Sequence, residues 1–69
     1  MSTDIEVFEE LVSELPWMQA VRTIRELDGG SSKEAGYTAR KIVTRCPESA
    51  LAKSYFSLPE DSASRQLFG

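Results

Sequence analysis

Apolar residues recur every three or four positions along most of this chain, which is the spacing of one face of an α-helix. The clearest example runs from Ser31 to Cys46. At about 100° per residue, one flank of this segment collects Ala35, Ala39, Ile42, Val43 and Cys46. The opposite flank collects Lys33, Tyr37, Arg40, Lys41 and Thr44. The pattern predicts a helix that packs on one side and faces solvent on the other.

Start and stop signals lie directly before this helix. Ser31 followed by Glu34 is typical of a helix N-terminus, because the two side chains can satisfy free backbone N–H groups. Asp28, Gly29 and Gly30 are typical of a helix C-terminus. We therefore expect two helices joined by a tight turn, an antiparallel helical hairpin.

The N-terminal half carries two apolar stripes separated by Pro16. The first stripe is Ile5, Phe8, Leu11, Val12 and Leu15. The second is Trp17, Ala20, Val21, Ile24 and Leu27. In a straight helix the stripes would differ by roughly 150°. Either the helix breaks or kinks at Pro16, or one long helix buries a different side in each half.

The predicted fold class is all-α, with no alternation that would indicate a strand. After Pro47 a short third helical segment is expected. Residues 1–58 would form the hairpin domain, and residues 59–69 a last turn or a tail. The core, or the seam of a dimer, is predicted to hold Phe8, Leu11, Leu15, Trp17, Val21, Ile24, Leu27, Ala39, Ile42 and Val43.

The size and composition of the chain narrow its class. A core built from 69 residues is small, so further burial in a homodimer is expected. A single cysteine and no histidine exclude an internal disulfide and a structural zinc site, and no metal site is expected. An acidic N-terminus and the lack of a long apolar run favour a cytoplasmic protein that does not enter a membrane.

Charge is distributed unevenly under a net charge of −3. Residues 1–19 hold five acidic residues and no basic one, whereas residues 20–53 hold seven basic and four acidic ones. The acids follow a solvated helix face rather than an opposed catalytic pair, and histidine, the commonest general base, is absent. We expect no enzyme activity and no cofactor.

The most informative surface is the basic face around Tyr37, with Lys33, Arg40, Lys41 and Thr44 beside it. Tyrosine and arginine are enriched in protein interfaces, because they combine large contact area with directional hydrogen bonds. Arg22 and Arg25 could extend this face from the preceding helix. These seven residues are the predicted partner-binding set.

Three functions fit this pattern. The first is a non-catalytic inhibitor or adaptor, in which a dimer presents the face around Tyr37 and Arg40 to an acidic patch or a nucleic-acid-binding surface of a larger protein. The second is a helix-turn-helix DNA-binding regulator, because KEAGYTARKI resembles a segment of phage terminase small subunits, although the net negative charge opposes DNA binding. The third is a structural oligomerisation module.

The overall layout resembles the small anti-quorum-sensing, host-takeover proteins of Mu-like temperate phages of Pseudomonas. The resemblance rests on the acidic first helix, the Pro16-Trp17-Met18 junction, the Asp28–Ser31 turn and the basic helix around Tyr37. It implies a homodimer that binds the DNA-binding domain of a host LuxR-type quorum-sensing activator and, in some members, the ATPase of type IV pilus assembly. A DNA-binding surface would attract acidic groups, so either the acidic helix or the Tyr37 face could make the contact.

Overall fold

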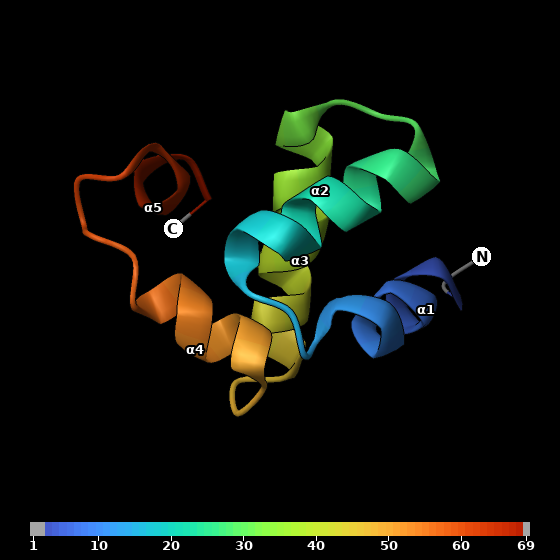
Figure 1. Ribbon diagram of the computed structural model, residues 1–69, viewed down its shortest axis with the longest axis horizontal. Coiled ribbons are helices and arrows are strands. Elements are labelled where there is room, and N and C mark those ends of the chain that lie inside the picture. Colours follow the sequence, from blue (N-terminus) through green and yellow to red (C-terminus); the bar gives the residue numbers. More distant parts are fainter. Residues whose placement is uncertain (1–2, 69) are drawn as a thin grey trace.

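The computed structural model describes residues 3–68, and all regular secondary structure in this range is helical, which confirms the predicted class (Figure 1). In chain order the helices are α1 (Thr3–Val12), α2 (Trp17–Asp28), α3 (Ser32–Arg45), α4 (Ala50–Phe56) and α5 (Ala63–Phe68). The central helix α3 contacts each of the other four. The described chain is thus a small cluster of helices around α3, whereas the prediction was a helical hairpin with one short third segment.

Pro16 breaks the N-terminal helix instead of kinking it. The first helix ends at Val12, and Pro16 precedes α2 in an extended conformation with φ −62° and ψ 157°. Proline is tolerated there because its missing N–H would have no partner inside the helix. The carbonyl of Ser13 accepts a hydrogen bond from the Leu51 N–H at 2.9 Å, which ties the break to α4.

The turn between α2 and α3 has the predicted glycine C-terminus and one of the two predicted cap hydrogen bonds. Gly29 ends α2 with φ 73°, a left-handed conformation that favours glycine, and its N–H donates to the Arg25 carbonyl. Ser31 Oγ accepts a hydrogen bond from the Glu34 N–H at 3.2 Å and so caps α3. This turn brings α2 back against α3, and these two helices share the most extensive contact in the fold.

The core confirms half of the predicted apolar set within a single chain. Five predicted residues are buried, namely Trp17, Ile24, Ala39, Ile42 and Val43. Three pack against the core while remaining partly exposed, namely Phe8, Leu15 and Val21. Helix α4 completes the core with Leu51, Ala52 and Tyr55, which were not in the predicted set.

Leu11 and Leu27 were predicted as core or seam residues, and a place in the core is wrong for both. They are 51% and 59% exposed. Leu11 lies on the outer side of α1, whereas the next residue, Val12, is buried. Leu27 belongs to the last turn of α2, where no later helix covers it. Burial of either side chain in a dimer stays a prediction.

The C-terminal residues form a docked helix. The Trp17 indole N–H donates to Ser64 Oγ at 3.0 Å. The Arg65 guanidinium donates to the Leu58 carbonyl at 3.2 Å, and the Phe68 ring packs against α3. Residues 59–68 therefore pack on the predicted hairpin domain, whereas residues 1, 2 and 69 lie outside the described range. Within residues 3–68, no helix combines the length and the apolar character needed to cross a bilayer.

Candidate binding groove

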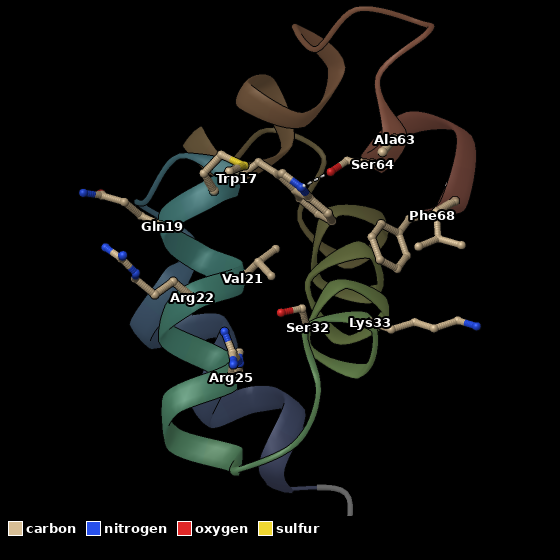
Figure 2. Close-up of a pocket in the computed structure, with 12 residues that line it drawn as sticks. Trp17, Gln19, Val21, Arg22, Arg25, Ser32, Lys33, Ala63, Ser64 and Phe68 are labelled. Atoms are coloured by element: carbon tan, nitrogen blue, oxygen red, sulfur yellow. Dashed lines mark hydrogen bonds between the residues drawn. The ribbon is translucent and has the colours of Figure 1, made fainter.

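A groove of about 560 Å³ lies between α2, the start of α3 and α5 (Figure 2). Its volume is in the range of ligand-binding clefts. Its apolar lining residues are Trp17, Met18, Val21, Ala63, Leu67 and Phe68. Its basic lining residues are Arg22, Arg25 and Lys33. The remaining lining residues are the neutral Gln19, Ser32 and Ser64.

One wall of the groove follows from the helical period of α2. Trp17, Val21 and Arg25 are each four residues apart, so their side chains lie above one another along one face. Trp17 is buried at the upper end of this face, Val21 is half-buried in the middle, and Arg25 is exposed at the lower end. The wall therefore changes from apolar to cationic along its length (Figure 2).

The opposite wall depends on aromatic contacts made by Phe68. Its ring centroid lies 5.8 Å from that of Trp17 and 5.0 Å from that of Tyr37, the latter edge to face. Such pairs add about 0.5–1.5 kcal/mol beyond the area that they bury. Tyr37 is 45% exposed, so it supports the outer side of Phe68 while keeping part of its surface free.

Gly36 explains how Phe68 can approach α3 so closely. A Cβ atom at Gly36 would overlap the Phe68 ring. Glycine within a helix costs roughly 0.5–1 kcal/mol relative to alanine. Here the missing side chain makes room for α5, and with it for one wall of the groove.

We expect Gly36→Ala to displace Phe68 and loosen α5, with only a small change in melting temperature. Better helix propensity in α3 offsets the lost aromatic contacts. Trp17 fluorescence and amide exchange in residues 63–68 would report the displacement. In a Phe68→Ala background the same substitution should instead stabilise the protein by roughly 0.5–1 kcal/mol. Unchanged exchange in α5 would contradict the assigned role of Gly36.

Positive charge borders the groove. Arg22, Arg25 and Lys33 are exposed, and Figure 2 shows Arg22 and Lys33 on its two sides with Arg25 near its lower end. None of the lining residues is acidic. A concave apolar surface with cations at its border attracts anionic groups and raises their local concentration.

The predicted partner-binding residues do not form one site. Arg22, Arg25 and Lys33 line the groove. The other four lie farther along α3, where Tyr37, Lys41 and Thr44 are exposed and Arg40 is half-buried. The set thus divides between the groove and the middle of α3.

Arg40 is held by its own chain. Its Nη1 donates to Thr44 Oγ1 at 2.7 Å, and its guanidinium carbon lies 5.1 Å from the centroid of the Tyr55 ring. The guanidinium carbon of Arg65 lies 5.4 Å from the same centroid. Cation–π contacts of this kind fasten α3 and α5 to α4. Arg40 is therefore a packing residue more than a free contact residue.

A separate ionic contact joins α1 to the end of α3. Arg45 Nε donates to Glu9 Oε1 at 2.8 Å, and this hydrogen bond lowers the pKa of the Glu9 carboxyl. Burial raises the pKa of the neighbouring Cys46 thiol, and the charge of Glu9 acts in the same direction. A thiol kept protonated is a poor nucleophile, so Cys46 is best interpreted as a packing residue.

No protein-family model, curated protein or solved structure matches this chain. The groove has to be interpreted from the residues that line it. Residues 3–68 contain no cluster of three or more His, Cys, Asp or Glu side chains placed to hold a metal ion.

The sequence prediction missed the contribution of α5 to the groove. Leu67 and Phe68 form the only pair of adjacent large apolar residues in an otherwise polar C-terminal stretch, which was a usable signal. Gly36 in the middle of a helical pattern was a second signal, because an interior glycine often marks a close approach. Neither signal predicts which residues are in contact, because the contacts of α5 join residues far apart in the sequence. Trp17 and Ser64, for example, are 47 positions apart.

Proposed function

We propose that this chain is a non-catalytic protein-binding protein whose groove receives an acidic, amphipathic segment of a partner. The observation that carries this proposal is the combination of an apolar floor with Arg22, Arg25 and Lys33 at the border and no acidic lining residue. Apolar side chains of a partner helix would enter the groove, and its carboxylates would pair with the border cations. Helix-in-groove binding with charged flanks is a common mode of recognition.

The chemistry of the lining favours binding over catalysis. The groove presents no carboxylate, thiol or imidazole, so it offers no general base to activate a substrate or a water molecule. Ser64 accepts a hydrogen bond from the buried Trp17 indole, and among the described residues no basic side chain is hydrogen-bonded to the Ser64 hydroxyl. Non-catalytic binding is therefore the function that these residues support best.

The class of partner is a proposal that rests on the resemblance to the phage anti-quorum-sensing proteins. A host regulatory protein in the cytoplasm, such as a LuxR-type activator, is the first candidate to test. Because the groove is basic, it would bind an acidic segment of such a protein. The basic DNA-contacting surface of an activator would suit the acidic outer side of α1 instead.

The test is capture of partners from bacterial lysate and direct binding to a purified full-length LuxR-type activator. Arg22→Glu/Arg25→Glu should lose the captured protein, with the dissociation constant rising by roughly tenfold or more because attraction becomes repulsion. Lys41→Glu/Lys53→Glu is the matched control, since it changes the net charge equally at exposed residues that do not line the groove. Circular dichroism would verify the fold of each variant.

Each outcome has a clear meaning. Loss of a discrete protein in the groove variant alone supports the proposal. Loss in the control alone would assign the contact to the middle of α3, near Tyr37. Equal retention by both variants would exclude the groove, and recovery of nucleic acid alone would favour the helix-turn-helix regulator.

A further inference from the structure

The outer face of α1 carries the chemistry that the groove would attract. At about 100° per residue, Glu6, Glu10, Val7 and Leu11 lie on one side of this helix. All four are exposed, and Val7 and Leu11 are 52% and 51% exposed. This face thus places two apolar residues, one helical turn apart, beside two carboxylates with the same spacing.

The opposite face of α1 is already held by the chain itself. Val12 is fully buried, and Ile5 and Phe8 pack against the core. The Glu9–Arg45 ion pair fastens the helix at its side. The outer face can therefore contact another molecule while α1 keeps its place in the fold.

We propose that the groove of one copy binds the outer face of α1 of a second copy. Val7 and Leu11 would enter the apolar part of the groove, and Glu6 and Glu10 would pair with the cations at its border. The argument is charge complementarity, because the chain presents an acidic apolar helix face and a basic apolar groove in one molecule.

The arrangement of the two surfaces sets the kind of assembly. In Figure 1, α1 and α5 lie at opposite ends of the molecule, and α5 contributes four of the residues that line the groove. A contact between two different surfaces is heterologous, so copies add head to tail. A helix of 10 residues is about 15 Å long and covers less than a standard interface, so this association is weak and concentration-dependent.

The contact and the proposed function share the groove but can fail separately. An external partner segment and a second copy cannot occupy the groove together, so a partner would dissociate the assembly. Self-association is measured on the purified chain alone, whereas the proposed function is measured by capture of another protein.

The experiment is sedimentation velocity over a wide range of protein concentration with two charge variants. Glu6→Lys/Glu10→Lys makes the α1 face basic, and Arg22→Glu/Arg25→Glu makes the groove border acidic. Each variant alone then brings like charges together and should associate roughly tenfold more weakly than wild type. Mixed in equal amounts, the two variants should associate again. The basic α1 face of the first variant meets the acidic groove border of the second, and the acidic α1 face of the second meets the basic groove border of the first.

Two further controls separate this contact from a general charge effect. Glu48→Lys/Glu60→Lys and Lys41→Glu/Lys53→Glu make the same net changes at exposed positions outside both surfaces and should behave as wild type. Wild-type association should weaken as salt rises, since exposed ion pairs are screened. A wild type that stays monomeric, a single variant that associates normally, or a mixture that does not recover would each overturn the proposal.

Discussion

Replacing Ile24 with aspartate is expected to unfold the protein. Ile24 is fully buried in the middle of α2, among the residues that join α2 to α3 and α4. A carboxylate there would lose its hydration, and none of the buried residues of the described range is charged and could pair with it. An unpaired buried charge costs several kcal/mol, and a core of this size typically provides only about 3–5 kcal/mol in total.

The measurement is thermal and urea unfolding followed by circular dichroism. Leu27→Asp is the matched control, because it introduces the same charge one turn later in the same helix at a residue that is 59% exposed. That variant should unfold within a few degrees of wild type, as most exposed substitutions do. A folded Ile24→Asp variant would show that α2 does not pack through this face. Destabilisation by Leu27→Asp would instead indicate that Leu27 is buried against a second chain.

Local signals in the sequence predicted the helices well. Ser31 and Gly29 mark helix boundaries through hydrogen bonds to residues three or four positions away. Hydrogen bonds of such short range can be predicted from the sequence. The periodicity likewise identified Ile24, Ile42 and Val43 as buried. Periodicity finds the apolar side of a helix, but it cannot tell whether another element covers each turn. This is why Leu11 and Leu27 were included in the predicted apolar set, although neither is covered within the single chain.

The groove could be predicted only in part. Arg22, Arg25 and Lys33 belonged to the predicted partner-binding set and line the groove. Lys33 was grouped with Tyr37 and Arg40 by helical spacing, and the two arginines were added from the helix across the turn. Whether a basic residue is free depends on tertiary contacts, and those of Arg40 with Tyr55 could not be inferred from spacing. The wall formed by α5 depends on the match of Phe68 to Gly36 across 32 positions, which no local pattern encodes.

The charge asymmetry of the sequence takes on a structural meaning in the fold. Two acids of the N-terminal stretch, Glu6 and Glu10, lie on the exposed outer side of α1, and part of the basic central stretch becomes the border of the groove. A chain with these two surfaces can attract partners of either charge sign. The same feature explains why its net charge alone is a poor guide to what it binds.

The second large effect is expected at Trp17, where α2, α4 and α5 meet. Its side chain is 1% exposed and is the largest among the fully buried ones. Its ring centroid lies 4.6 Å from that of Tyr55, and its indole N–H holds Ser64. Trp17→Ala removes the floor of the groove and leaves a cavity, which typically costs about 3–5 kcal/mol. This loss is comparable to the whole stability expected for a core of this size, so the variant should be largely unfolded at 25 °C.

Three other variants separate the contributions of Trp17, and urea unfolding of all four would measure them. Trp17→Phe keeps an aromatic ring against Tyr55 but loses the hydrogen bond, so it should retain the fold with reduced stability. Ser64→Ala removes only the acceptor, which should cost about 1 kcal/mol and loosen α5 before the other helices. Met18→Ala changes the adjacent residue, which is 72% exposed, and should stay within about 0.5 kcal/mol of wild type. If Trp17→Ala unfolded no more easily than Met18→Ala, the Trp17 ring would not lie between α2, α4 and α5. The groove would then lack the floor on which both proposed contacts depend.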